Sequence, residues 1–177
     1  MVQRCLLGVV GGFLSVSIGL FATDVVASNV VARVLPNGEA IELEIPTDIG
    51  PQKESLPLYY SGKVRYFSAG IGLVEREATY PPFSLKLVFT AGGKAFVTGV
   101  DVTLRSAEGT TVLTVPREQV TGPWLFIDLS DGTYEVAATL GDVTQKVKGI
   151  KVRQGHVTTQ HVRWAEDRSP SLSAEVE

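Results

Sequence analysis

The sequence contains very little cysteine and histidine. Cys5 is its single cysteine, and His156 and His161 are its two histidines, among 177 residues. Because Cys5 lies in the apolar N-terminal segment, a chain processed after that segment would contain no thiol. Such a chain forms no disulfide and has no cysteine for metal binding or nucleophilic catalysis. It must be stabilised by its apolar core, and 44% hydrophobic residues are typical of a globular domain.

An excess of positive charge is also missing. The formal net charge is -3, with 16 basic and 19 acidic residues. The aromatic residues are scattered and do not alternate with Arg or Lys, as they do on surfaces that stack against bases. The sequence therefore argues against a nucleic-acid partner.

A long hydrophobic run occurs once, at the N-terminus. Arg4 precedes an uncharged apolar stretch at 6–21, and the small residue Ala27 follows it. This order is typical of a secretory signal peptide, so we predict a signal at 1–27 that is cleaved after Ala27, and a periplasmic protein. The alternative is an uncleaved anchor, although the run is shorter than the roughly 20 residues that cross a bilayer. The mature chain is then expected to have no membrane span.

Recognisable catalytic motifs are missing as well. The sequence contains no HExxH, no GxSxG and no calcium-binding loop. His156 and His161 are five residues apart on a predicted strand, which would place them on opposite faces, where they cannot chelate one metal. We therefore expect no metal, no cofactor and no enzymatic activity.

What the sequence does contain is alternation of apolar and polar residues with the period of a β-strand. The clearest stretch is 122–140, where two alternating segments flank Ser130, Asp131 and Gly132. This pattern predicts two strands joined as a hairpin by a tight turn. The residues expected to face the core are Leu125, Ile127 and Leu129, then Tyr134, Val136, Ala138 and Leu140.

Similar patterns divide the rest of the chain. A hairpin is predicted at 28–46 around Asn37 and Gly38. A linker with a short helix is predicted at 47–82, and residues 63–67 within it are predicted to form a short strand. Seven strands are predicted at 83–164, with a β-bulge at Gly149, and a disordered tail at 165–177. The expected fold class is therefore all-β, as a β-sandwich with an N-terminal hairpin and one short helix.

A combination of short motifs between 68 and 164 resembles a known family. They are SAGIG and ERE at 68–77, FSLKLVF, GVDVTLRSAEGTTVL, GPWLFIDLSDGTYEVAATLGD and the closing HVTTQHVRW. Together they resemble small exported bacterial carboxypeptidase regulatory-like proteins, which are similar to the transthyretin-like accessory domain of some metallocarboxypeptidases. The resemblance implies a seven-stranded Greek-key β-sandwich, a periplasmic location and no catalytic activity.

Four residues are candidates for partner binding. Trp124 and Phe126 alternate with core residues, so they face away from the predicted core. Either this strand is central and both its faces are covered, by the N-terminal hairpin or the short helix, or the two aromatics form an exposed patch for a partner or a sugar. Glu75 and Arg76, in the short helix, are weaker candidates and are expected to form local ion pairs with Glu77.

The resulting functional hypothesis is a non-enzymatic periplasmic interaction module. It would bind a protein or envelope component through an edge strand or the aromatic face. One alternative is a carbohydrate-binding β-sandwich that stacks a sugar on an exposed Trp124. A remote alternative is an unrecognised hydrolase that uses His156 or His161.

Overall fold

A computed structural model describes residues 30–93 and 95–165. The predicted signal peptide at 1–27 and nearly all of the predicted tail at 165–177 lie outside the described residues. The described part of the chain is mostly β-structure, with thirteen strands and one short α-helix. The predicted all-β fold class is confirmed.

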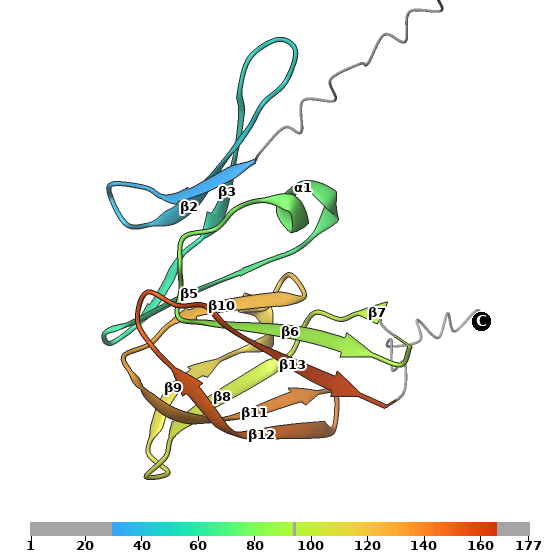
Figure 1. Cartoon of the computed structure of the whole chain (residues 1–177). Coiled ribbons are helices and arrows are strands. Elements are labelled where there is room, and N and C mark those ends of the chain that lie inside the picture. The colour runs from blue at the N-terminus through green and yellow to red at the C-terminus, as the bar shows by residue number, and fades with distance from the viewer. Residues whose placement is uncertain (1–29, 94, 166–177) are drawn as a thin grey trace, which may run out of the picture.

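The strands form three sheets that lie in layers (Figure 1). The first is a small N-terminal sheet with the order β1-β2-β3, formed by β1 (Val31–Val34), β2 (Ala40–Ile45) and β3 (Gln52–Pro57). Antiparallel pairing of β1 with β2 confirms the predicted hairpin, and the register places Val34 opposite Ile41.

The middle layer is a six-stranded sheet with the order β13-β6-β10-β5-β4, and β7 pairs with the end of β6. Neighbouring strands are antiparallel, except that β13 runs parallel to β6. Its strands are β4 (Tyr59–Ser61), β5 (Val64–Ala69), β6 (Leu85–Ala91), β7 (Ala95–Phe96), β10 (Trp124–Asp128) and β13 (Thr158–Trp164).

The third layer is a four-stranded antiparallel sheet with the order β12-β11-β8-β9. The bulge predicted at Gly149 is confirmed, because the register of β11 with β12 shifts between Tyr134 and Val136, and Gly149 has a φ of 71°. The strands of this sheet are β8 (Asp101–Ser106), β9 (Thr111–Val115), β11 (Gly132–Leu140) and β12 (Val143–Val152).

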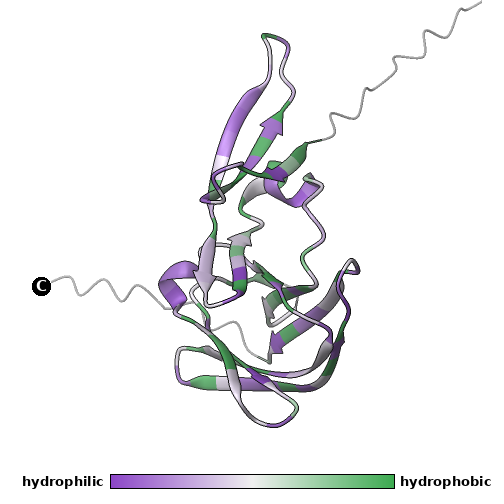
Figure 2. Ribbon diagram, turned by 90° about the vertical axis from the view of Figure 1, so that its left-hand side faces the viewer, coloured by the Kyte–Doolittle hydropathy of each residue, from purple (hydrophilic) through white to green (hydrophobic). Residues whose placement is uncertain are grey.

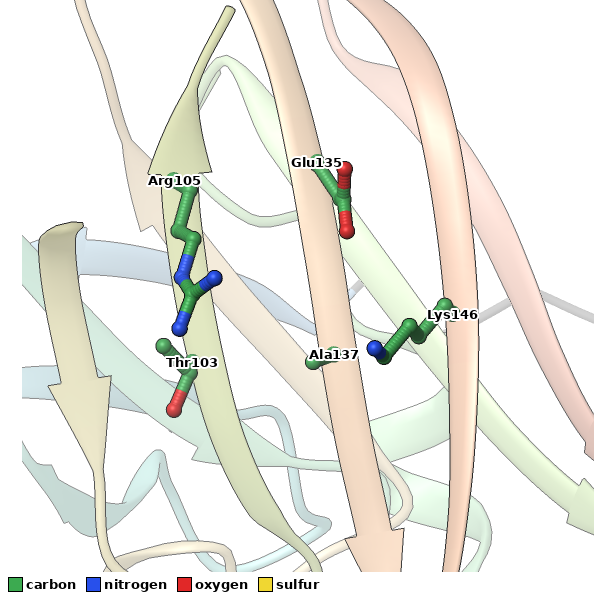
Figure 3. Close-up of a pocket in the computed structure, with 5 residues that line it drawn as sticks. All are labelled: Thr103, Arg105, Glu135, Ala137 and Lys146. Atoms are coloured by element: carbon green, nitrogen blue, oxygen red, sulfur yellow. The ribbon is translucent and has the colours of Figure 1, made fainter. Parts of the chain in front are cut away.

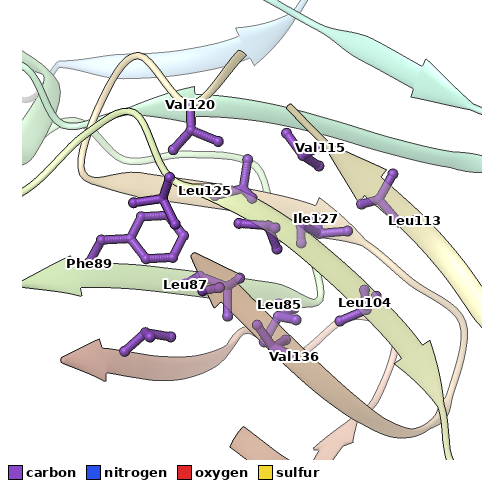
Figure 4. Packing of buried hydrophobic residues seen from close by; sticks show 14 of the residues in the cluster. Leu85, Leu87, Phe89, Leu104, Leu113, Val115, Val120, Leu125, Ile127 and Val136 are labelled. Atoms are coloured by element: carbon purple, nitrogen blue, oxygen red, sulfur yellow. The ribbon is translucent and has the colours of Figure 1, made fainter. Parts of the chain in front are cut away.

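The main core lies between the six-stranded and the four-stranded sheets (Figure 4). Alternation of hydrophilic and hydrophobic residues along the strands (Figure 2) gives each sheet an apolar inner face. The larger fully buried side chains include Leu85, Leu87, Phe89, Leu104, Leu113, Leu125 and Ile127.

The predicted hairpin at 122–140 is wrong, because its two strands belong to different sheets. β10 pairs with β5 and β6, whereas β11 pairs with β8 and β12. The turn at Ser130, Asp131 and Gly132 carries the chain from one sheet to the other. The apolar residues of both strands face the same core from opposite sides. Alternation specified which side chains are buried, but it could not specify which strands are paired.

The segment at 47–82, predicted to be a linker with one short strand at 63–67 and a short helix, contains three strands in addition to a helix; β5 corresponds to the predicted strand, and β3 and β4 were not predicted. β3 completes the N-terminal sheet, and β4 and β5 belong to the six-stranded sheet. The predicted short helix is present as α1 (Gly72–Glu77). The predicted strand positions within 83–164 are all occupied, with β7 in addition and a short 3-10 helix, η1 (Arg117–Gln119), between β9 and β10.

A second core lies between the N-terminal sheet and the outer face of the six-stranded sheet. It joins Ile41 and Leu43 of β2 to Phe67, Phe83 and Phe126. The Phe67 and Phe126 rings are stacked with their centroids 4.7 Å apart, and Phe83 meets Phe67 edge-on at 4.9 Å. The N-terminal sheet therefore covers part of the outer face of the six-stranded sheet and leaves the part formed by β6 and β13 open.

Candidate functional site

Phe126 is not a surface residue. Its side chain is 4% exposed and packs in the second core. The strand that carries it, β10, is central, since it lies between β5 and β6. The exposed-patch interpretation is therefore wrong for Phe126. The alternative, that the N-terminal hairpin covers this face of the strand, is confirmed.

Trp124 is only partly buried, but its ring is contacted by Lys86 of the neighbouring strand β6 and lies close to Gly70, the residue after β5. Lys86 Nζ of β6 lies 3.3 Å from the centre of the indole ring, in a cation–π contact. On the side of β5, a methyl group added to Gly70 would lie 3.0 Å from the indole carbon Cδ2. An indole held in this way does not present the open face that the carbohydrate hypothesis required of Trp124.

Glu75, predicted as a binding residue, is buried, with 5% of its surface exposed. Its Oε2 atom accepts hydrogen bonds from the backbone N–H groups of Gly70 (2.6 Å) and Ile71 (3.0 Å). Burial raises the pKa of Glu75, although these two N–H groups favour the ionised form. Glu75 thus anchors the start of α1 and does not reach a partner.

Arg76 is exposed and makes no ion pair within the described residues, so the predicted pairs with Glu75 and Glu77 are not formed. Its guanidinium carbon instead lies 5.6 Å from the centre of the Phe96 ring. This contact connects α1 to β7, at the end of the six-stranded sheet (Figure 1).

Beside this contact, the open part of the six-stranded sheet contains a groove of about 360 Å³. Strand pairing explains its composition, because His161 lies opposite Val88, and Thr90 lies opposite both Arg163 and Phe96. Buried Val88 forms an apolar floor, while Phe96 is 46% exposed. The groove is lined by Val88, Thr90, Phe96, His161 and Arg163.

The groove is bordered by basic side chains. Arg163 donates two hydrogen bonds to the carbonyl oxygen of Gly92 (2.6 and 3.2 Å), which hold its guanidinium at the end of β13. Lys86 precedes Val88 by two residues on β6, so it faces the same side of the sheet. Burial lowers the pKa of Lys86. None of the described residues that line the groove is acidic.

Exposed apolar side chains are also found on α1 and at Ile71, the residue before it. Leu73 is 65% exposed and Ile71 is 56% exposed, and Val74 is also exposed. Glu75, the buried residue of this helix, occupies the side that packs against the protein. The helix therefore presents apolar residues to solvent, on the side of the protein where Arg76 meets Phe96.

Sequence reasoning did not identify Val88, Phe96 or Arg163 as site residues. The signal available was the alternation at 86, 88 and 90, and again at 159, 161 and 163, which places polar and apolar residues on the outer face. Strands β6 and β13 are separated by about 70 residues and pair in parallel. No local pattern in the sequence indicates that these two strands are neighbours.

The two histidines do not form a common site. His156 precedes β13 instead of lying on it, and both side chains are exposed. Within the described ranges, no group of three His, Cys, Asp or Glu side chains is placed to hold a metal ion. Among the same residues, no helix has the length and apolar character needed to cross a bilayer.

Comparison with protein-family models, with curated proteins and with solved structures finds no match for this chain. The resemblance to carboxypeptidase regulatory-like proteins therefore stays a prediction from the motifs.

Proposed function

We propose that this protein is a non-enzymatic interaction module of the periplasm. It binds an extended acidic segment of a partner protein of the cell envelope in the groove on β6 and β13. We further propose that residues 83–164 contribute the seven strands of a Greek-key β-sandwich of the carboxypeptidase regulatory-like type. The predicted signal at 1–27 supports the location, and the distribution of these strands over two facing sheets supports the fold.

The observation that carries the proposal is the exposure of apolar side chains at Phe96 and at the helix that contacts it through Arg76. Large apolar side chains that gather on one surface are unfavourable in water and commonly mark interaction sites. Here Phe96 and Val88 line the groove, and exposed Leu73 and Ile71 belong to α1 and to the residue before it, on the element that Arg76 joins to Phe96. Because the groove has an apolar floor and an open side, a chain in extended conformation fits it better than a compact ligand.

The charges around the groove indicate the chemistry of the partner. Arg76, Lys86 and Arg163 are basic, and the residues lining the groove carry no opposing carboxylate. Complementary charge accelerates association and determines the orientation of a partner, while the apolar contacts supply affinity. We therefore expect a segment with apolar residues next to Asp or Glu.

A photo-reactive amino acid at position 96 tests the proposal in cells of the natural host. Covalent products of defined mass are expected from position 96. The same amino acid at Thr114, exposed on the outer face of the four-stranded sheet, should give none of these products. The products should disappear in the Leu73→Ser variant, which changes an exposed side chain and should leave stability within about 0.5 kcal/mol.

Equal crosslinking from positions 96 and 114 would contradict the proposal, because it would indicate contact without a defined surface. Binding of a glycan panel to the wild type and to the Phe96→Ala variant distinguishes the carbohydrate alternative from a protein partner. Glycan binding that is lost in this variant would assign the groove to a sugar in place of a protein.

A further inference from the structure

A second, smaller hollow lies on the opposite side of the protein, on the outer face of the four-stranded sheet. Its volume is about 50 Å³, and it is lined by Thr103, Arg105, Glu135, Ala137 and Lys146 (Figure 3). One water molecule requires roughly 10–15 Å³ of such space. The hollow therefore has room for a group of several non-hydrogen atoms.

The register of the strands explains why a hollow forms here. Ala137 lies in the middle of a cross-strand row, with Thr103 of β8 on one side and Lys146 of β12 on the other. In the next row, Arg105 lies opposite Glu135. Because the Ala137 side chain is a single methyl group between longer neighbours, it leaves a gap. The head groups of Arg105 and Lys146 approach this gap from the two flanking strands (Figure 3).

The charges around the hollow are not balanced. The carboxylate of Glu135 forms an ion pair with Lys148, with Nζ 3.6 Å from Oε2. Asp101, farther along β8, accepts a hydrogen bond from the Arg117 backbone N–H at 3.0 Å and forms an ion pair with its side chain. Neither Arg105 nor Lys146 has an ion-pair partner within residues 30–93 and 95–165.

We propose that this hollow binds a tetrahedral oxyanion, a phosphate or sulfate group, between the Arg105 guanidinium and the Lys146 ammonium. A guanidinium offers a planar fork of N–H donors and an ammonium offers a compact charge, and both are common phosphate ligands. The Thr103 hydroxyl supplies a further polar group at the wall. Because the hollow opens to solvent, the anion is either free or the head group of a larger molecule such as an anionic lipid.

Titration of the isotopically labelled full chain with inorganic phosphate tests this site by NMR. Ionic strength is held constant with chloride. Saturable shifts are expected at the amides of Thr103, Ala137 and Lys146 and at Arg105 Nε. Loss of one charge-assisted hydrogen bond should weaken binding about tenfold, in Arg105→Gln and in Lys146→Gln alike. Ala137→Leu should abolish binding without a change in charge, because it fills the hollow.

Lys151→Gln is the matched control, since it removes the same charge from an exposed position of the same strand, away from the hollow. Its affinity for phosphate should stay within about twofold of the wild type, as expected for screened surface charges. If Lys151→Gln weakens binding as much as Lys146→Gln, or if chloride produces the same shifts, the anion is adventitious only and the proposal is wrong.

Vesicles of phosphatidylglycerol, compared with vesicles of phosphatidylcholine, separate the two sources of the anion. Co-sedimentation with the anionic vesicles that is lost in Arg105→Gln would assign the site to a lipid head group. Phosphate binding without co-sedimentation would assign it to a free anion. A variant spectrum that retains the wild-type dispersion shows that the variant is folded, and Arg105→Gln keeps the test valid if Ala137→Leu does not fold.

Discussion

At the scale of single residues, two phenylalanines of the six-stranded sheet differ in exposure, although each lies on a strand of that sheet. Phe126 is covered by the N-terminal sheet, whereas Phe96 is half-exposed beside the groove. Both are aromatic residues of strands in the same sheet. One therefore contributes to the stability of the fold, and the other is available for binding.

Truncation of each ring should give opposite results. Phe126→Ala should lower the free energy of unfolding by about 3–5 kcal/mol, because it leaves a cavity in a packed aromatic cluster. Phe96→Ala should change it by no more than about 0.5 kcal/mol. Urea unfolding measures both. Equal, small effects would mean that the second core is not formed in solution.

Glu42 is a charged residue whose role depends on two neighbouring strands. Its Oε1 atom is 2.9 Å from Arg33 Nη2 of β1 and 3.2 Å from Lys53 Nζ of β3. Hydrogen bonds from these two cations lower the pKa of Glu42 below its usual 4.5. The unfolded chain therefore binds the proton of Glu42 more readily than the folded chain does.

This difference predicts how stability depends on pH. The contribution of Glu42 is fully present above about pH 4.5 and is lost as the pH falls through the lowered folded pKa. Glu42→Gln should therefore flatten the acid side of a plot of unfolding free energy against pH. Glu77→Gln, an exposed change on α1, should leave that slope nearly unchanged. An identical effect of the two variants would exclude the ion-pair explanation.

At the scale of elements, the bulge at Gly149 divides β12 into two parts whose inward-facing side chains are buried to different extents. Before the bulge, Val143 and Val147 are partly buried at the side of the main core, and after it Ile150 and Val152 are buried. The bulge adds one residue to the strand and so shifts the alternation by one position, which turns Ile150 and Val152 toward the core. This feature was predictable because the apolar residues change phase at a glycine.

Gly149→Ala tests the backbone requirement of the bulge. Space around the added methyl is open, so the cost is that of the left-handed backbone, about 1–2 kcal/mol. Gly93→Ala is the matched control, because its surroundings are also open and its φ is outside the left-handed region. Thermal unfolding should show a loss of stability for Gly149→Ala alone.

At the scale of the whole molecule, the six-stranded sheet includes a strand, β5, that lies outside the predicted sandwich at 83–164. β10 is paired with β5 along the whole length of β10, from Trp124 opposite Ala69 to Asp128 opposite Arg65. The Arg65 guanidinium also forms a 2.7 Å ion pair with Asp128. Residues 83–164 alone would leave β10 without this partner.

We expect a chain shortened to residues 83–164 not to fold, and a chain of residues 58–165 to fold but to bind a hydrophobic dye. The longer piece retains β5 but exposes the rings of Phe67, Phe83 and Phe126, which the N-terminal sheet normally covers. Circular dichroism and dye fluorescence measure both outcomes. A well-dispersed NMR spectrum from 83–164 would show that the sandwich is independent of β5.

Local patterns in the sequence were sufficient for the fold class, the N-terminal hairpin, the short helix, the bulge and most strand positions. Each of these depends on interactions between residues close together in the chain, through alternation, turn residues and glycine. The pairing of β10 with β5, the parallel pairing of β13 with β6 and the burial of Phe126 depend on contacts between distant segments. Alternation specifies that a side chain is covered, but it does not specify by which strand. The groove at Phe96 and the hollow at Ala137 therefore exist only in the tertiary structure, because each combines side chains from strands far apart in the sequence, β6 with β13 in the groove and β8 with β11 in the hollow.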